Sequence, residues 1–286
     1  MAKQFLTRFG SIAILLCLCT PFLSAAPKLT EKWATGSVFE VPESVCLDPD
    51  KKLVYVSNIS GSPSEKDGNG FISKVSLEGE VLELKWITGL NAPKGMAVQG
   101  RFLYVTDIDV LVRINRETGE ILNRYPAKGA LFLNDVAADK KGNVITGDSA
   151  ENSSTLYVLR NDRLQVWRTG EPVNRPNGLS FFGDYLFVGN VGDGELLKVN
   201  PRSKSVRSVG NADSRIDGLE PLKDRSFLVS NFLGRISWIS AAGELEVLQD
   251  TEAEKINAAD FEFIEELGLL IVPTFFDNRL VAYTVE

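Results

Sequence analysis

Oxygen-bearing side chains occupy the same position in a short phrase that recurs along the sequence. The phrase is a charged or amide residue, a small residue and an apolar residue at the head of a strand-like run. Its first position holds Glu43, Lys94, Asn134, Asn177, Asp217 and, in the weakest copy, Ala259. Carboxylate and amide oxygens are the ligands that Ca²⁺ prefers, and Mg²⁺, Mn²⁺ or Zn²⁺ are alternatives. The ligands predicted for one divalent cation are Glu43, Asn134, Asn177 and Asp217.

The spacing of the phrase indicates how these residues are brought together. The six copies are separated by 51, 40, 43, 40 and 42 residues. A period near 40 residues is typical of the blades of a β-propeller. In a propeller the first strand of each blade lines the central channel, so equivalent positions form a ring at one mouth of the channel. The spacing therefore predicts that ligands far apart in the chain meet on the propeller axis.

Each repeat contains short runs of β-branched and aromatic residues separated by turn residues. The first repeat predicts strands over residues 44–47, 53–57, 71–76 and 80–86. The sixth has three such runs, 261–264, 269–272 and 280–285, and residues 29–35 form a spare strand near the N-terminus. Pairing the spare strand with the sixth repeat closes a ring. We therefore predict an all-β, six-bladed β-propeller over residues 27–286, with one helical turn over 252–259.

The first 26 residues have the pattern of a secretory signal peptide. Lys3 and Arg8 precede an apolar run from Ser11 to Leu23, and Ser24-Ala25-Ala26 offers the small residues that a signal peptidase accepts. A retained N-terminal anchor is the alternative. Cleavage would leave Cys46 as the single thiol, so no internal disulfide is expected. We predict an exported protein, periplasmic or secreted, with no membrane segment after cleavage.

The composition excludes several classes of function. The 286-residue chain has a formal net charge of -7 and no basic run, so we expect no nucleic-acid partner. It contains no histidine, which excludes Ser-His-Asp and Cys-His catalysis and any zinc site that needs imidazole. The partner that we expect is a small-molecule substrate, bound by a monomer.

The recurring phrase also has a simpler interpretation. Single Asn-Gly and Asp-Gly pairs are common in turns, so Asn177-Gly178 or Asp217-Gly218 alone would favour a turn. Their recurrence at one repeat position favours a binding site. Two carboxylates there would repel each other, and a cation would relieve the repulsion. Lys94, at the matching position, should turn away from the ion or pair with an acid such as Asp107.

Four phrases resemble the senescence marker protein/gluconolactonase family, which includes regucalcin. They are Pro42-Glu43-Ser44-Val45, Phe132-Leu133-Asn134-Asp135, Pro176-Asn177-Gly178-Leu179 and Ile216-Asp217-Gly218-Leu219. The resemblance spans essentially residues 27–286 and implies a six-bladed propeller with one divalent metal, bound by Glu43, Asn177 and Asp217. It also implies that Asn134 contacts the substrate or completes the metal shell. Asp217 would be the general base in lactone hydrolysis.

One position departs from the family pattern. Members that act on sugar lactones carry an arginine two residues before the asparagine that matches Asn134, where this sequence has Phe132. An apolar ring cannot donate hydrogen bonds to sugar hydroxyls, so a less polar lactone or ester is expected. The predicted function is metal-dependent hydrolysis, in which Asp217 and Asn134 are catalytic and Phe132 and Asn134 bind substrate. A non-catalytic exported propeller that binds a small molecule or a protein partner is the alternative.

Overall fold

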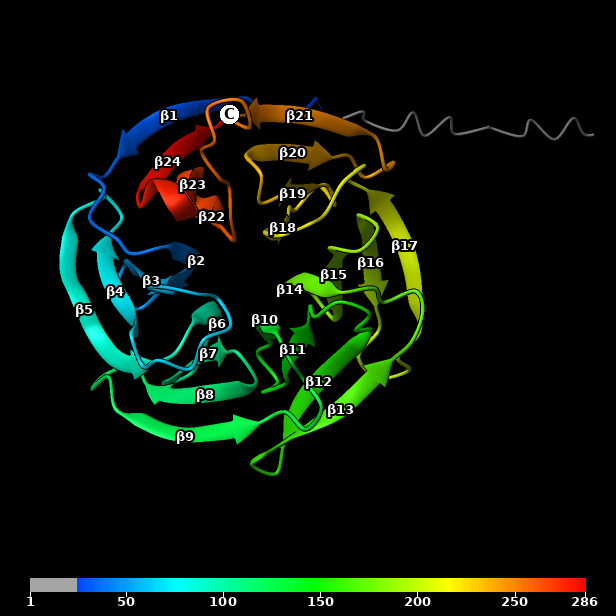
Figure 1. The fold of residues 1–286 in the computed structure, drawn as a ribbon. Helices are drawn as coiled ribbons and strands as arrows, with labels where there is room; N and C mark the ends of the chain where they lie inside the picture. The colour runs from blue at the N-terminus through cyan, green and yellow to red at the C-terminus, as the bar shows by residue number, and fades with distance from the viewer. Residues whose placement is uncertain (1–24) are drawn as a thin grey trace, which may run out of the picture.

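Six four-stranded antiparallel sheets surround a central axis in the computed structural model, which describes residues 25–286 (Figure 1). Each sheet is one blade, and its strands are stacked from the axis outward. The fold is the six-bladed β-propeller that the sequence period predicts. The predicted signal peptide falls almost wholly on residues 1–24, outside the described residues.

The strands occupy equivalent places in every blade. The innermost strands are β2 (Pro42–Asp48), β6 (Pro93–Gln99), β10 (Leu133–Ala138), β14 (Pro176–Phe182), β18 (Leu219–Pro221) and β22 (Glu262–Ile264). The second strands are β3 (Leu53–Asn58), β7 (Phe102–Asp107), β11 (Val144–Asp148), β15 (Tyr185–Asn190), β19 (Phe227–Ser230) and β23 (Leu269–Pro273). The third strands are β4 (Gly70–Ser76), β8 (Val110–Asn115), β12 (Thr155–Arg160), β16 (Glu195–Val199), β20 (Arg235–Ile239) and β24 (Leu280–Val285). The outer strands are β5 (Val81–Leu90), β9 (Ile121–Pro126), β13 (Arg163–Thr169), β17 (Val206–Asn211), β21 (Leu245–Asp250) and β1 (Leu29–Ala34).

Strand β1 supplies the outer strand of the sixth blade. It pairs antiparallel with β24, so that Leu29 lies opposite Val285. The indole nitrogen of Trp33 donates a hydrogen bond to Leu77 O of the first blade at 3.1 Å. The two ends of the chain therefore close the ring together, as predicted, and pairing leaves no open seam between the sixth blade and the first.

Removing residues 27–36 is expected to destabilise the whole propeller, because the deletion takes away β1 and the packing of Trp33 against the first blade. Loss of several backbone hydrogen bonds, at roughly 1 kcal/mol each, should lower the midpoint of thermal unfolding by on the order of 10 °C. Thermal unfolding of the truncated chain, compared with a chain that begins at residue 27, measures this. An unchanged midpoint would contradict closure by β1.

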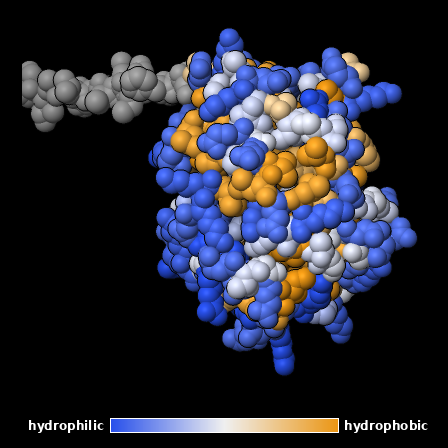
Figure 2. Space-filling view, turned by 90° about the vertical axis from the view of Figure 1, so that its left-hand side faces the viewer, coloured by the Kyte–Doolittle hydropathy of each residue, from blue (hydrophilic) through white to orange (hydrophobic). Residues whose placement is uncertain are grey.

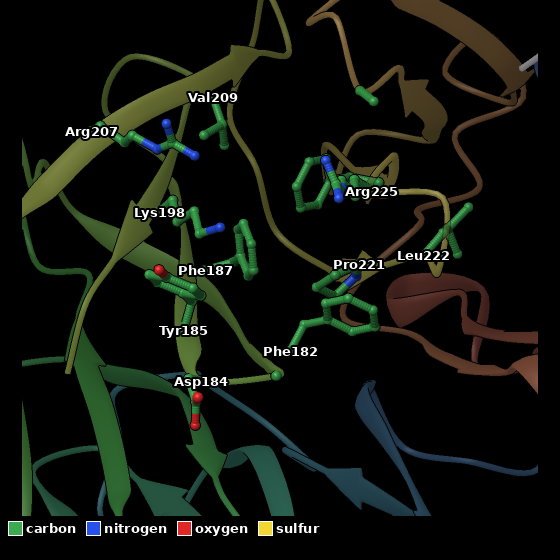
Figure 3. A pocket seen from close by; sticks show the side chains of 13 residues that line it. Phe182, Asp184, Tyr185, Phe187, Lys198, Arg207, Val209, Pro221, Leu222 and Arg225 are labelled. Atoms are coloured by element: carbon green, nitrogen blue, oxygen red, sulfur yellow. The ribbon is translucent and has the colours of Figure 1, made fainter. Parts of the chain in front are cut away.

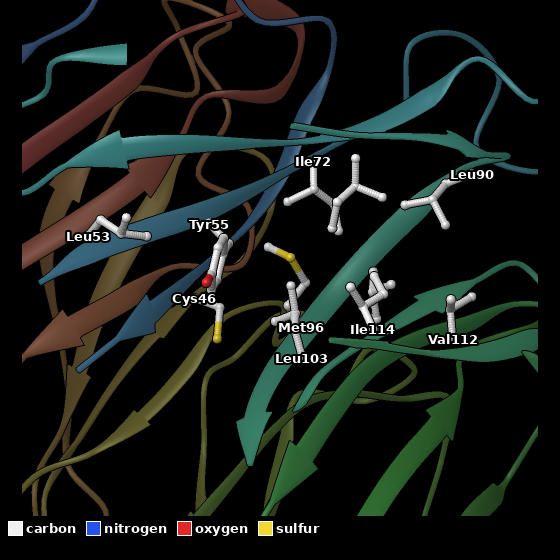
Figure 4. Close-up of a cluster of buried hydrophobic side chains, with 11 residues drawn as sticks. Cys46, Leu53, Tyr55, Ile72, Leu90, Met96, Leu103, Val112 and Ile114 are labelled. Atoms are coloured by element: carbon white, nitrogen blue, oxygen red, sulfur yellow. The ribbon is translucent and has the colours of Figure 1, made fainter. Parts of the chain in front are cut away.

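The hydrophobic core is divided into wedges between neighbouring blades. Figure 4 shows the wedge between blades 1 and 2, where Tyr55 and Ile72 meet Met96 and Leu103. Strand β3 is buried along its whole length, and its first four residues, 53–56, are accordingly an uninterrupted apolar run. Cys46 lies in the same wedge as a free, buried thiol.

The outer strands face solvent. In β5, Leu82 is 50% exposed, whereas Ile87 is buried. Figure 2 shows the side of the ring that carries β1 and β5, where hydrophilic side chains surround bands of apolar ones.

Helical structure is minor in the described part of the chain, where two 3₁₀ turns, η1 (Glu265–Leu267) and η2 (Phe275–Asp277), are the only helical elements. The helical turn expected over residues 252–259 is a hydrogen-bonded turn instead, in which Lys255 N donates to Glu252 O at 3.1 Å. No helix among residues 25–286 is long and apolar enough to cross a membrane.

Candidate functional site

The four oxygen-bearing residues predicted from the repeat lie together at one mouth of the central channel. They line a cavity of about 330 Å³, which Lys94 and Phe132 also line. Each of the four residues is at least nine-tenths buried. The residues concerned are Glu43, Asn134, Asn177 and Asp217.

An irregularity at the start of four innermost strands places Glu43, Asn134 and Asn177, whereas Asp217 lies just before β18. The pairing register of β2 shifts between Pro42 and Ser44, and that of β14 shifts between Pro176 and Leu179. Strands β6 and β10 carry the same irregularity. A β-bulge puts an extra residue into one strand, redirects its side chain and often occurs beside binding sites. The recurring phrase in the sequence marks this irregularity.

The small residue after the ligand position lets neighbouring blades approach closely. A Cβ atom on Gly178 would lie 2.3 Å from Asp217 O, and one on Gly95 would lie 2.3 Å from Oδ1 of Asp135. Glycine is therefore required at both places, since no other residue fits without a shift of the backbone. This close approach brings Asn177 next to Asp217.

The hydrogen bonds of the ring leave two oxygens unsatisfied. Asn177 Nδ2 donates to Oδ1 of Asp217 at 2.5 Å. Asn177 Oδ1 and Glu43 Oε2 are buried without a hydrogen-bond partner, and within residues 25–286 they are the only buried side-chain oxygens in this condition. Buried polar atoms are almost always paired, so an unpaired oxygen needs an explanation. A hard cation beside these two oxygens and the Asp217 carboxylate would satisfy both, and the donor set fits Ca²⁺.

Burial makes the two carboxylates among the four predicted ligands difficult to ionise. Burial, with repulsion by Asp217, raises the pKa of Glu43 well above its usual range, and attraction by Lys94 opposes this. Burial raises the pKa of Asp217 to about 7, against the hydrogen bond from Asn177 and the charge of Arg215. A divalent cation would reverse both shifts, because it stabilises the charged forms.

Lys94 does not pair with Asp107, which corrects one expectation. Its Nζ donates to Pro63 O at 2.9 Å and to Ala92 O at 3.0 Å, and it lies 4.4 Å from the centre of the Phe132 ring. Burial lowers the pKa of Lys94 to about 8, opposed by attraction to Glu43 and Asp107. The ammonium group therefore stays in the cavity wall. Its partner Pro63 belongs to a polar insertion over residues 61–69, which makes the first repeat longer than the others and thus reaches the cavity mouth.

The ends of the second strands hold the loops that enter the site. Asn58, Asp107, Asp148 and Asn190 all accept hydrogen bonds from backbone N–H groups of the loop before the innermost strand. Asp148 Oδ1, for example, accepts from Phe132 N at 2.9 Å. These residues therefore position the cavity lining.

Several residues that line the cavity were not singled out from the sequence as site residues. Arg175 and Arg215 each lie two residues before a predicted ligand, at the position that Phe132 occupies in its own repeat. That shared offset is a signal that the repeat alignment contains. An aromatic wall completes the mouth, and it consists of Phe232, Phe275 and Phe276.

Further acids follow the inner strands along the channel. Asp260 Oδ2 accepts from Ser44 Oγ at 2.6 Å, and Glu262 Oε2 accepts from Leu47 N at 2.9 Å. Burial raises the pKa of Glu220, and repulsion by Glu262 and then Asp260 adds to this. Among the described residues no group of three or more cysteine, aspartate or glutamate side chains is arranged to hold a metal. The candidate cation site therefore depends on amide oxygens as well as two carboxylates.

Replacing Glu262 by glutamine should stabilise the fold at pH 8 but not at pH 4. Burial raises the pKa of Glu262 to about 7, so the folded chain binds more protons than the unfolded chain between about pH 4.5 and 7. Wild-type stability therefore falls as pH rises from about 4.5 to about 7, by on the order of 3 kcal/mol. Glutamine does not ionise, and its amide oxygen still accepts from Leu47 N. Urea unfolding at both pH values measures the difference; equal effects at pH 4 and pH 8 would contradict this account.

Fold and site together define a six-bladed propeller whose axial cavity presents carboxylate and amide oxygens. No protein-family model and no curated protein matches the sequence. Among solved structures, a gluconolactonase from Xanthomonas campestris is similar over 92% of this chain and 96% of its own, with a TM-score of 0.66 and 14% identity. Virginiamycin B lyase from Staphylococcus aureus is similar over 90% of this chain and 99% of its own, with a TM-score of 0.63 and 13% identity.

A chain from a nidogen/laminin complex is similar over 71% of this chain and 77% of its own, with a TM-score of 0.59 and 16% identity. At these identities the likeness confirms the propeller fold. Membership of the senescence marker protein/gluconolactonase family stays a prediction.

Proposed function

We propose that this protein is a divalent-metal-dependent hydrolase that opens a lactone or related ester with an apolar or aromatic part. The observation that carries the proposal is the pair of unsatisfied buried oxygens, Glu43 Oε2 and Asn177 Oδ1, beside the Asp217 carboxylate. The similar gluconolactonase supports an enzyme of this kind at the level of fold.

Glu43, Asn177 and Asp217 would hold the cation, and Asn134 would complete its shell or contact the substrate. A bound ion of this kind polarises a carbonyl and lowers the pKa of a water molecule. Asp217 would accept the proton of the attacking water as the general base. The amide of Asn134 donates a hydrogen bond to the oxygen on which negative charge develops.

The cavity wall indicates the substrate class. Phe132, Phe232 and Phe275 give one part of the wall an apolar surface. Arg175 and Arg215 bring positive charge to the mouth, which suits the negative charge that develops on ester cleavage. A lactone with an aromatic or acyl substituent fits this arrangement better than a sugar lactone. We also propose that the protein is exported to the periplasm or the medium and acts there as a monomer.

A panel of aryl- and alkyl-substituted lactones and esters, assayed in H₂¹⁸O, tests the proposal. We expect turnover with Ca²⁺, loss of turnover with a chelator, recovery on adding Ca²⁺, and ¹⁸O in the acid product. An unsaturated product without ¹⁸O would show elimination, the reaction of a lyase, and would overturn hydrolysis. Ca²⁺ binding without turnover of any member would favour the non-catalytic binding propeller.

A further inference from the structure

A second cavity, of about 410 Å³, lies between the fourth and fifth blades, away from the channel mouth. Strand β14 connects the two places, since Asn177 near its start lines the central cavity and Phe182 at its end lines this one. Their separation along the strand is about 16 Å. Aromatic rings from both blades line the second cavity, and those of Phe182 and Tyr185 are each 36% exposed. Apolar surface is thus open to a ligand here.

Three cations converge on this cavity. Lys198 and Arg207 project from the fourth blade and Arg225 from the fifth, as Figure 3 shows. Lys198 Nζ lies 3.7 Å from the centre of the Tyr185 ring. Burial lowers the pKa of Lys198, and the charges of Arg207 and Arg225 lower it further, so each arginine is close enough to repel Lys198.

Lys198 has no acidic partner within residues 25–286. It forms no salt bridge there, and the charges that act on it are those of Arg207 and Arg225, although the protein as a whole is acidic. Asp184, which also lines the cavity, pairs with Lys141 on a different side. The cavity therefore presents uncompensated positive charge beside apolar rings.

Two other blades carry a cation at the position equivalent to Lys198, and both differ from the fourth blade in having an acid partner. Lys74 in β4 and Arg113 in β8 lie opposite Tyr55 and Tyr104, as Lys198 lies opposite Phe187. At the first two positions an acid completes the arrangement: Glu83 is 3.2 Å from Lys74 Nζ, and Asp162 is 3.1 Å from Arg113 Nη1. The fourth blade has the same aromatic and cationic residues, Phe187 and Lys198. The place that an acidic side chain takes in the other two blades is open to a ligand here.

We propose that the cavity binds an organic anion with a flat apolar body, such as an aromatic carboxylate. The anionic head lies among Lys198, Arg207 and Arg225, where charge-assisted hydrogen bonds form. The body stacks between the rings of Tyr185 and Phe227, which bound the cavity from the two blades. This site is separate from the proposed hydrolytic site and needs no metal.

Calorimetric titration with 1-naphthoate in a chelator at pH 7.5 tests the proposal, with uncharged 1-naphthamide as the matched probe. We expect naphthoate to bind at least about tenfold more tightly than the amide, and Lys198→Met to weaken naphthoate about tenfold. Arg225→Gln, which changes an exposed side chain, should act in the same direction. Lys74→Met is the control, because it removes an equivalent stacked lysine that already has an acid partner. Asp217→Asn should not alter the affinity, which separates this site from the central cavity.

Four outcomes would overturn the proposal. One is no binding of naphthoate at millimolar concentration, and another is equal affinity for acid and amide. The third is an unchanged affinity in both Lys198→Met and Arg225→Gln, and the fourth is an equal loss of affinity in Lys74→Met. Thermal unfolding of each variant shows that it is folded before it is titrated.

Discussion

Replacing Asp217 by asparagine is expected to abolish hydrolysis and to weaken Ca²⁺ binding only in part. Asparagine keeps an oxygen at the cation site but has no carboxylate to accept the proton of the attacking water. A positioned general base contributes about 10²–10⁴-fold to such a reaction, so kcat should fall by at least that factor. Lactone turnover at saturating Ca²⁺, measured with the affinity for Ca²⁺ in the same variant, separates the two roles.

Asn177→Ala is the matched control for this prediction. It removes a neutral oxygen next to Asp217 but leaves the proton acceptor in place. Its activity should therefore return toward the wild-type value when the Ca²⁺ concentration is raised, whereas that of Asp217→Asn should not. If Asp217→Asn hydrolyses lactones as fast as wild type, the proposed mechanism is wrong.

Glu43→Gln should have opposite effects on the stability of the free protein and on metal binding. Without a cation, Glu43 is a buried carboxyl with one unpaired oxygen and a raised pKa. A raised pKa means that stability is lost as pH rises through the folded-state pKa, and glutamine does not carry this penalty. The variant should unfold a few degrees higher than wild type at pH 8 in a chelator.

With Ca²⁺ present, wild type should become the more stable of the two proteins. Wild type should gain about 3 kcal/mol at a hundredfold excess over Kd, whereas the variant has lost a charged ligand and should gain much less. Thermal unfolding at pH 8, with chelator and with Ca²⁺, provides all four values. A variant that is less stable than wild type in both conditions would show that Glu43 has a packing role instead.

The sequence predicted the fold because the repeat records it. The copies of the phrase mark the starts of the innermost strands, so their spacing predicted the six blades. Because the first positions of the copies are equivalent, they also predicted a ring of side chains around the axis. The spare strand near the N-terminus predicted that β1 closes the propeller. The small second residue, such as Gly178, was visible in the sequence, but its cause is the close approach of Asp217 O in the next blade. Such a contact between repeats has no local signal.

The remainder of the cavity wall was not predictable because it depends on loop conformation. Arg175, Phe232 and Phe275 have left-handed backbones, with φ of 52°, 67° and 51°. Residues other than glycine seldom adopt this conformation, and the residue types around these positions do not predict it. The direction of these side chains is set by loops that the second-strand residues hold, as Asp148 holds Phe132. The partner of Lys94 was not predictable for a related reason, since Pro63 lies in the insertion over residues 61–69.

Calorimetric titration of the chelator-treated protein with Ca²⁺ shows whether the axial cavity binds one divalent cation. We expect one site per chain in wild type and a Kd at least tenfold higher in Glu43→Gln, because a charged ligand is lost. A protein that binds no divalent ion at millimolar concentration, or a Glu43→Gln variant that binds Ca²⁺ as tightly as wild type, would contradict this prediction.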